Sequence, residues 1–326
     1  MEGNTMKIAN LRGLCVAAIL AAGTAGAAHA AETEAVFGFS GWSVGYLPTA
    51  IALDRLAEQG YDIKAVELGG NSNQLQAAAT GAIDISAIAQ ILDAMDQGLD
   101  SKFFLAGNSN EFLLVSTTGL NSCESLDGKS LGIHSVGSFV GQLALQYLAA
   151  NCPGTNANVT VIEGSENRLA ALIAGQLDSS VIDLQDWTLL NAKMPGKFEI
   201  TSDFTSSMPI MRAAFAARPD FIASHEKLVT DWVKVHLDVY QELYENPQIL
   251  TDKGLELLDE IDPQVLPQLV DAFVKAKIWP VDGGLSEASV QETIDFFNND
   301  GEPFQTVKKA ADVVDRTILD KALADR

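Results

Sequence analysis

The chain has 326 residues, and its 21 lysines and arginines against 43 aspartates and glutamates give a formal net charge of −22. Hydrophobic residues make up 47%, which is enough for a packed core, and the length is typical of two domains. The acidic balance excludes a nucleic-acid-binding protein, because phosphate contacts require clustered lysines and arginines. It also disfavours binding to an anionic membrane surface.

The first 30 residues are predicted to be a secretory signal peptide. Lys7 and Arg12 form a basic start, residues 13–28 are uncharged and rich in alanine and leucine, and Ala28-His29-Ala30 is a small-x-small cleavage site. The stretch is too short and too rich in alanine and glycine for a membrane anchor, and no later segment is apolar enough to span a bilayer. Cleavage after Ala30 would release the mature chain into the periplasm, with no direct membrane insertion.

Two cysteines follow the leader, Cys123 and Cys152. An exported chain meets an oxidising compartment, which permits a disulfide. Cys123 precedes an expected strand and Cys152 follows the helix that this strand feeds, and such a unit returns the chain to the edge where the strand began. The layout favours a Cys123–Cys152 disulfide over two separate buried thiols.

Short β-rich runs alternate with helical patterns over the first two thirds of the mature chain, which indicates βαβ units and mostly parallel sheets. The expected strands are Val36–Ser40, Ile63–Leu68, Ile83–Ala87, Phe103–Ala106, Phe112–Thr117, Ser130–His134, Val159–Glu163, Ser179–Asp183 and Phe198–Thr201. The expected helices between them lie at about 47–59, 71–81, 88–98, 138–150, 166–175 and 184–193. After Pro219 only helices are expected, at about 224–246, 263–277, 286–299 and 311–323.

An internal repeat is the most informative feature of the chain. The pattern Gly70-x4-Leu75-x5-Gly81-x2-Asp84 recurs 94 residues later as Gly164-x4-Leu169-x5-Gly175-x2-Asp178. A strand is expected before and after each copy, and the second glycine of each copy suits the left-handed end of a helix. The repeat therefore predicts two similar α/β lobes with a cleft between them.

Ligands of open α/β sheets bind beyond the carboxyl ends of the strands, where helix N-termini favour anionic groups. The helix starts expected at this cleft are Asn71-Ser72-Asn73, Gly137-Ser138-Phe139 and Ser165-Glu166-Asn167. Their small polar side chains either cap a helix or contact a ligand, and the sequence leaves both roles open.

No arrangement of residues for catalysis stands out. Gly70-Asn71-Ser72-Asn73-Gln74 lacks the final glycine of a nucleophile elbow, and Gly128-Lys129-Ser130 lacks the upstream glycine of a phosphate-binding loop. His225 and His236 are expected at the surface or in packing, whereas His134 has either a structural role or a ligand contact. No cluster has metal-ligand spacing. Neither a metal nor a cofactor is expected, and the chain is not expected to be an enzyme.

The order of several short motifs resembles that of the periplasmic substrate-binding proteins of ABC importers. The similarity is to the nitrate/sulfonate/taurine group, which also contains the thiamine-precursor-binding proteins. The motifs are, in chain order, Gly45-Tyr46-Leu47-Pro48, Gly69-Gly70-Asn71-Ser72, Gly81-Ala82-Ile83-Asp84-Ile85, Leu126-Asp127-Gly128-Lys129-Ser130-Leu131-Gly132-Ile133, Ala170-Ala171-Leu172-Ile173-Ala174-Gly175-Gln176-Leu177-Asp178, Arg218-Pro219-Asp220-Phe221-Ile222 and Tyr244-Glu245-Asn246-Pro247. Together they cover nearly all of the mature chain.

The resemblance implies an α/β fold, the two-lobed periplasmic binding protein fold of type II. Two mostly parallel sheets would be joined by hinge strands and followed by a helical C-terminal tail. The expected divisions are a signal peptide at 1–30, the first part of lobe I at 31–120, lobe II at 121–214, and a return to lobe I with C-terminal helices at 215–326. The hinges would lie near Phe112–Gly119 and Met208–Ala217.

The resemblance also implies a ligand site with contributions from both lobes. Lobe I would supply residues after its first strand, at a helix start and after its third strand: Ser40, Gly41, Trp42, Asn71, Ser72, Ala89 and Gln90. Lobe II would supply Ser138, Phe139 and Asp183. The chain departs from the family pattern at Asp183-Leu184-Gln185, where many relatives have an aromatic residue or Glu followed by Pro.

A protein of this kind would be a monomer that closes on a small-molecule ligand and delivers it to an ABC permease in the inner membrane. Aromatic residues near the cleft favour an organic ligand, anionic or zwitterionic. Acidic residues at the cleft, Glu163, Asp183 and Asp186, would need a cationic partner from Arg168, Arg212 or the ligand. The alternatives are a periplasmic ligand sensor that docks on a receptor and an exported enzyme on the same fold.

Overall fold

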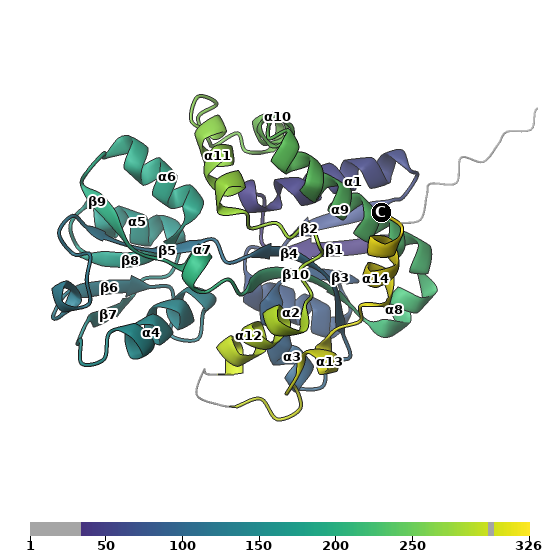
Figure 1. Cartoon of the computed structure of the whole chain (residues 1–326), viewed down its shortest axis with the longest axis horizontal. Coiled ribbons are helices and arrows are strands. Elements are labelled where there is room, and N and C mark those ends of the chain that lie inside the picture. Colours follow the sequence, from purple (N-terminus) through teal and green to yellow (C-terminus); the bar gives the residue numbers. More distant parts are fainter. Residues whose placement is uncertain (1–33, 299–302) are drawn as a thin grey trace, which may run out of the picture. The chain divides into compact units, whose positions relative to one another are not determined.

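The computed structural model describes residues 34–298 and 303–326, so the leader and its predicted cleavage site lie outside the described residues. The described part contains two five-stranded sheets with helices packed on their faces (Figure 1). This arrangement confirms the predicted α/β fold with two sheets. We call them sheet A and sheet B.

Sheet A has the strand order β2-β1-β3-β10-β4. Its first three strands are parallel, and β10 runs antiparallel to both β3 and β4. The bounds are β1 (Ala35–Phe39), β2 (Ile63–Glu67), β3 (Ile85–Ala87), β4 (Lys102–Ser109) and β10 (Met211–Ala217).

Sheet B repeats this plan with the order β7-β6-β8-β5-β9. Its bounds are β5 (Phe112–Thr117), β6 (Ser130–Ile133), β7 (Asn158–Val161), β8 (Ser179–Asp183) and β9 (Phe198–Asp203). Strands β6, β7 and β8 are parallel, and β5 is antiparallel to β8 and β9. Both sheets are thus mixed, with more antiparallel pairing than predicted. Strand β5 enters sheet B from sheet A, and strand β10 enters sheet A from sheet B. Each is antiparallel to the three parallel strands of the sheet that it enters.

Helices flank both sheets, and the chain after Pro219 is helical as predicted. The segments before that point are η1 (Val44–Tyr46), α1 (Leu47–Glu58), α2 (Asn71–Thr80), η2 (Ala89–Ile91), α3 (Leu92–Asp96), η3 (Glu124–Leu126), α4 (Phe139–Asn151), α5 (Ser165–Ile173), α6 (Leu184–Lys193) and α7 (Phe204–Ser207). The C-terminal helices are α8 (Pro219–Ser224), α9 (Glu226–Glu245), α10 (Gln248–Leu257), α11 (Leu266–Ala276), α12 (Glu287–Asn298), α13 (Ala310–Val313) and α14 (Thr317–Ala324). No helix in the described ranges is both long and apolar enough to cross a membrane.

The two copies of the sequence repeat build equivalent parts of the two sheets. The Asp84 carboxylate accepts a hydrogen bond from the N–H of Val36 at 2.9 Å, and Asp178 accepts one from the N–H of Ser130 at 2.9 Å. Each bond spans 48 residues and ties the end of one βα unit to the first of the three parallel strands of its sheet. The repeat is therefore a structural duplication.

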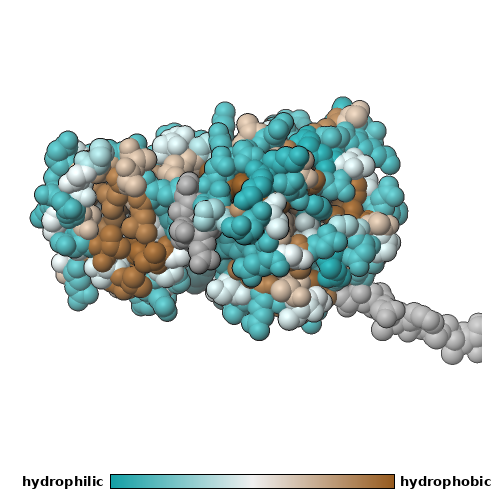
Figure 2. All heavy atoms as spheres, turned by 90° about the horizontal axis from the view of Figure 1, so that it is seen from below, coloured by the Kyte–Doolittle hydropathy of each residue, from teal (hydrophilic) through white to brown (hydrophobic). Residues whose placement is uncertain are grey.

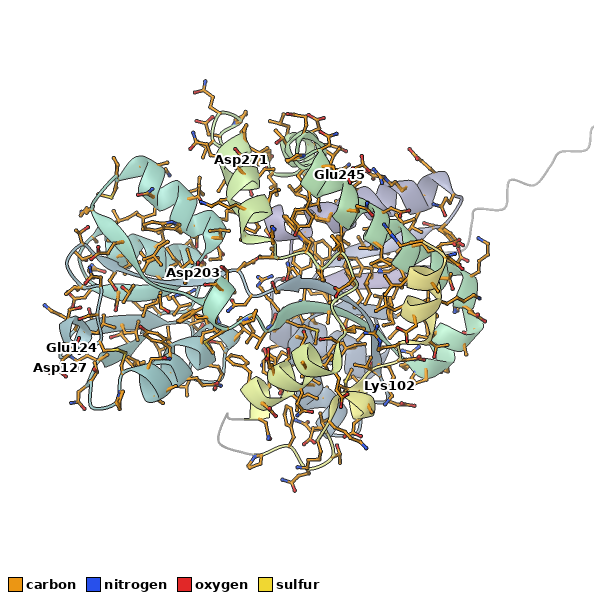
Figure 3. All side chains as sticks on the ribbon, in the orientation of Figure 1. Lys102, Glu124, Asp127, Asp203, Glu245 and Asp271 are labelled. Atoms are coloured by element: carbon orange, nitrogen blue, oxygen red, sulfur yellow. A yellow bond between two sulfur atoms is a disulfide. The ribbon has the colours of Figure 1, made fainter. Side chains whose placement is uncertain are left out.

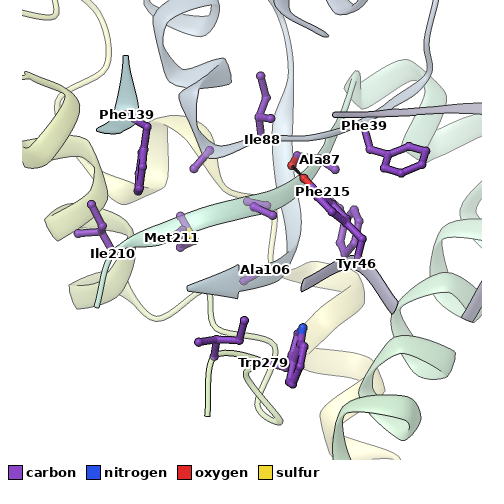
Figure 4. Packing of buried hydrophobic residues seen from close by; sticks show 14 of the residues in the cluster. Phe39, Tyr46, Ala87, Ile88, Ala106, Phe139, Ile210, Met211, Phe215 and Trp279 are labelled. Atoms are coloured by element: carbon purple, nitrogen blue, oxygen red, sulfur yellow. Dashed lines mark hydrogen bonds between the residues drawn. The ribbon is translucent and has the colours of Figure 1, made fainter. Parts of the chain in front are cut away.

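Aromatic packing in sheet A fixes the segment that follows β1. Tyr46 is buried, and its hydroxyl donates to the carbonyl of Ala87 at 3.1 Å (Figure 4). The indole N–H of Trp279 donates to the carbonyl of Gly45 at 3.0 Å. His236 is also fully buried, stacked on Trp232, and burial lowers its pKa to about 3. The packing role expected for this histidine holds.

The sheet B half carries a disulfide and an apolar edge. Cys123 and Cys152 are bonded, which ties the segment before β6 to the end of α4. Strand β7 forms an edge of sheet B and leaves Val159 and Val161 39% and 53% exposed. Figure 2 shows an apolar patch on this half of the protein.

Candidate ligand-binding site

A cavity of about 610 Å³ lies between sheets A and B. This volume is within the range of pockets that take small organic molecules, about 300–1,000 Å³. Both halves of the protein line it, including the starts of β5 and β10, the two strands that follow the crossings between the sheets. The lining residues are Ser40, Tyr46, Gly69, Gly70, Asn71, Ser72, Asn73, Ile88, Gln90, Phe112, His134, Ser135, Gly137, Ser138, Phe139, Val140, Gly164, Ser165, Glu166, Arg168, Asp183 and Arg212.

Seven of the ten residues expected to contact a ligand line this cavity, namely Ser40, Asn71, Ser72, Gln90, Ser138, Phe139 and Asp183. Gly41, Trp42 and Ala89 are not among the lining residues. The Trp42 ring packs on Phe39 with 4.3 Å between ring centroids, and Ala89 is fully buried in η2. Contact of any of the ten with a ligand stays a prediction.

Helix starts from both halves face the cavity. Ser138 caps α4, because its hydroxyl accepts from the N–H of Gly141 at 3.1 Å. Helices α2 and α5 begin instead after Gly70 and Gly164, so no side chain caps their first N–H groups. Asn71 donates through Nδ2 to Oε1 of Gln90 at 2.9 Å, which holds two lining side chains together. The site thus offers backbone donors from two helices as well as side-chain amides and hydroxyls.

A buried ion pair lies at the crossing between the sheets. Nε of Arg212 on β10 is 3.2 Å from Oε1 of Glu111, and the guanidinium lies over the Phe112 ring, 5.4 Å from its centroid. Glu111 is 3% exposed, and its Oε2 has no hydrogen-bond partner among the described residues. Burial raises the pKa of Glu111, and the Arg212 charge opposes that shift. Arg212 therefore presents a fixed positive charge to the cavity.

Two more carboxylates meet at the carboxyl end of β8. Oδ1 of Asp183 accepts from the N–H of Asp186 at 2.7 Å and so caps α6, and Asp186 accepts from the Ser165 hydroxyl. Burial and then the nearby Glu111 charge raise the pKa of Asp183. Burial and then the Asp183 charge raise the pKa of Asp186 to about 7. Both carboxyls of the pair thus hold a proton at a higher pH than a free aspartate does.

Several lining residues were not in the predicted set. Ser165 was expected at a helix start of the cleft and His134 as a possible ligand contact, and both line the cavity, whereas Ser135, the repeat equivalent of Gly41, was missed. Nδ1 of His134 accepts from the N–H of Gly164 at 3.1 Å, which gives this side chain a structural role. Phe112 and Arg212 lie at the starts of β5 and β10, just after the crossings and outside both repeat copies, and of the two only Arg212 was named beforehand, as a possible partner of the acidic residues.

No group of three or more histidine, cysteine, aspartate or glutamate side chains within residues 34–298 and 303–326 is arranged to hold a metal ion. No protein with a curated description matches the sequence.

Solved structures share the fold. The zinc-bound ligand-binding component of an ABC-type import system from Staphylococcus aureus has a TM-score of 0.70 and 14% identity, over 88% of this chain and 97% of that one. The alkanesulfonate-binding protein SsuA from Xanthomonas axonopodis pv. citri, bound to MOPS, has a TM-score of 0.65 and 17% identity, over 86% and 98%. The periplasmic aliphatic sulphonate-binding protein SsuA from Escherichia coli has a TM-score of 0.62 and 15% identity, over 73% and 82%.

A sequence-level match accompanies this likeness. The family model described as NMT1/THI5 like matches residues 46–249, which is more than half of the chain. The matched range contains both repeat copies and both crossings between the sheets. It confirms the predicted resemblance: this chain belongs to the NMT1/THI5-like family.

Proposed function

We propose that this protein is an extracytoplasmic solute-binding protein, which captures a small organic molecule between sheets A and B and delivers it to an ABC permease. The observation that carries the proposal is the cavity of about 610 Å³ lined from both sheets. The names of the structures with the same fold, components of ABC import systems and sulfonate-binding proteins, support this function.

The two crossings are the proposed hinges, and the predicted divisions at residues 120 and 214 are the proposed lobe boundaries. The first crossing lies between β4 and β5 and the second between α7 and β10. Asn110 connects them, because its Nδ2 donates to the carbonyls of Phe204 and Met208 at 3.2 Å each. A ligand that contacts both halves would stabilise their closed arrangement and shift the hinge equilibrium toward it.

Two direct contacts between side chains or backbone of the two halves also join them. Oε1 of Gln185 on α6 accepts from the N–H of Val44 at 3.3 Å. Phe139, a lining residue on α4, packs on Phe296 of α12 with 5.3 Å between ring centroids. In the proposed cycle these contacts form with the closed state, whose surface the permease recognises.

The remaining parts of the proposal follow from the sequence. The leader would direct the chain to the periplasm, the mature protein would act as a monomer, and no bond of the ligand would be made or broken. A sensor that docks on a membrane receptor would use the same cavity. Docking of the loaded protein on a permease in reconstituted vesicles, with stimulation of its ATPase, would separate transport from sensing.

Thermal unfolding of the mature protein with the small-molecule fraction of a periplasmic extract tests solute capture. Ser72 is exposed at the start of α2 and lines the cavity, whereas Gln76 is exposed on the same helix outside it. We expect the extract to raise the Tm of the wild type and of Q76W, because binding to the native state stabilises it. S72W, which places an indole at the wall of the cavity, should show no shift. Equal shifts in all three proteins would contradict the proposal.

A further inference from the structure

Five buried or half-buried charged side chains meet at the sheet B end of the cavity. Three are the carboxylates of Glu111, Asp183 and Asp186, and two are the guanidiniums of Arg168 and Arg212. Glu166 of α5, His134 after β6 and Tyr46 of η1 are the other titratable groups that face this end. With every carboxyl ionised, the five groups would carry one uncompensated negative charge in a region of low dielectric, which is costly.

The excess negative charge is located at Asp183 and Asp186. Glu111 has its counter-ion in Arg212, at 3.2 Å. Nη1 of Arg168 donates to the backbone carbonyls of Ile162 and Gly164, at 3.3 and 2.9 Å, and forms no ion pair with a described carboxylate. Within the described residues, the hydrogen bonds to the Asp183 and Asp186 carboxylates come from neutral donors, an N–H and a hydroxyl. Of the two, Asp183 lines the cavity.

A second feature indicates that a ligand binds at this end. Arg168 is 2% exposed and lines the cavity, and its Nε has no partner among the described residues. A buried donor without a partner is costly unless another polar group satisfies it. An acceptor would satisfy Arg168 and a cationic group would balance Asp183, and one ligand can carry both groups.

The internal repeat shows that the fold does not require these charges. Arg168 and Asp183 correspond to Gln74 and Ala89 in the first copy. Both of these residues are uncharged and fully buried, and the sheet A half has the same strand order without the charges. The charged residues are thus particular to one side of the cavity.

We propose that the ligand carries a protonated nitrogen group, an amine or an amidine, which binds the carboxylate of Asp183 and displaces one proton from the Asp183–Asp186 pair. This inference rests on the proposed function. In the empty protein one proton on the pair leaves the five groups neutral. In the complex both carboxyls are ionised, the cation of the ligand takes the place of the proton, and the proton passes to the buffer. The net charge of the site is the same in both states.

Matched small compounds test the charge of the ligand. The probes are benzylamine and benzamidine as cations, benzyl alcohol and benzamide as neutral analogues, and benzoate as the anion, each at about 10 mM. All carry a benzene ring because Tyr46, Phe112 and Phe139 supply aromatic walls to the cavity. We expect only the cations to raise the Tm. Isothermal titration at pH 6 in phosphate and in a buffer of high ionisation enthalpy should show release of up to one proton per cation. As the pH is raised toward the pKa of the pair, the affinity for the cations should increase by up to about tenfold per pH unit. Above that pKa the affinity should level off.

Two variants separate the charge of Asp183 from its structural role. Asp183→Asn keeps the helix cap, because asparagine caps as well as aspartate, and we expect it to lose proton release and to bind the cations at least about tenfold more weakly. Asp127 is the control: it is exposed on the sheet B half (Figure 3), and its Oδ1 likewise accepts one backbone N–H, from Asn156 at 2.9 Å. Asp127→Asn should behave as the wild type.

The inference would be overturned by unchanged cation binding in D183N, by binding without proton release at pH 6, or by the absence of any shift from the cations. A shift from benzoate alone would also overturn it, but would leave solute capture standing. Loss of solute capture itself is detected separately, by the extract test with S72W and Q76W.

Discussion

Gln74 of α2 and Arg168 of α5 occupy the same position in the two repeat copies, and both side chains are buried, with 0% and 2% exposed. The amide of Gln74 donates to the carbonyl of Gly38 and accepts from the N–H of Ser40, at 3.2 Å each. Arg168 donates to the carbonyls of Ile162 and Gly164. Each side chain thus joins the start of its helix to the end of a neighbouring strand. Gln74 does so without a charge, whereas Arg168 is charged.

Replacement of Arg168 tests this structural role. Arg168→Met removes both side-chain hydrogen bonds and leaves the carbonyl of Ile162 without its donor, whereas the carbonyl of Gly164 keeps the backbone N–H of residue 168, so we expect a loss of roughly 2–4 kcal/mol in the free energy of unfolding. Arg168→Gln, which restores the residue type of the first copy, should lose less. Lys193→Gln, at an exposed position on α6, is the control and should stay within about 0.5 kcal/mol. Denaturant unfolding measures all three, and an R168M protein as stable as K193Q would contradict the role.

The raised pKa of Asp186 predicts a specific pH dependence of stability. Because its pKa is about 7 when folded and 3.8 in the unfolded reference, the folded state holds more protons between these values. The free energy of unfolding should therefore fall as the pH rises from about 4 to about 7, by a few kcal/mol at most. Asp186→Asn cannot ionise, so its Tm should fall less than that of the wild type over this range. Parallel Tm profiles would contradict the assignment.

Asp96 predicts the opposite pH dependence. Burial would raise its pKa, but hydrogen bonds from the N–H groups of Val307, Gln305 and Thr306 outweigh burial and lower the pKa to about 2. Its stabilising effect should be present above about pH 4 and be lost as the pH falls toward 2. Asp96→Asn should cost about 1 kcal/mol at pH 7, since the carboxylate is partly solvated, and markedly less at pH 2. A cost that is the same at both pH values would contradict this account.

Asn110 should be essential to the connection between the crossings. It is fully buried, donates to Phe204 and Met208, and accepts from the N–H of Phe112 at 3.0 Å. Asn110→Ala removes all three hydrogen bonds and leaves the buried N–H of Phe112 without its acceptor, whereas the two carbonyls keep backbone donors, so we expect a loss of roughly 2–4 kcal/mol. Asn191→Ala, at an exposed position on α6, should be close to neutral. Urea unfolding compares the two, and a neutral N110A would show that the crossings are held by other contacts.

The strand pattern predicted most of the two sheets. The observed bounds of β5 and β8 equal the predicted ones, because Phe112–Thr117 and Ser179–Asp183 are short β-rich runs between clear breaks. Strand β10 was expected only as a hinge, through the family resemblance. Its sequence is rich in alanine and lacks β-branched residues, and its pairing with β3 and β4 makes it a strand.

Helix α10 was missed because Gly254 interrupts its helical pattern. A Cβ at this position would lie 2.9 Å from the Leu266 side chain, so the glycine permits close packing against α11. The helix is stabilised by this tertiary contact rather than by its local propensity.

The site was predictable where the chain repeats itself and not where it crosses between the sheets. Asn71, Ser72 and Ser138 stand at helix starts that the sequence pattern places at the cavity, and Asp183 was supplied by the family resemblance. Arg212 reaches the cavity through a long-range strand pairing that no local pattern encodes. Trp42 was expected at the ligand site as an aromatic wall, but its ring packs on Phe39 and is not among the residues that line the cavity.

Native mass spectrometry of residues 31–326, purified from a periplasm without unfolding, tests the capture of a solute between the sheets most directly. The account predicts one additional small-molecule mass per chain, lost after unfolding and refolding, absent from S72W and retained in Q76W. A wild-type protein that is empty after native purification, or a bound mass that persists in S72W, would contradict it.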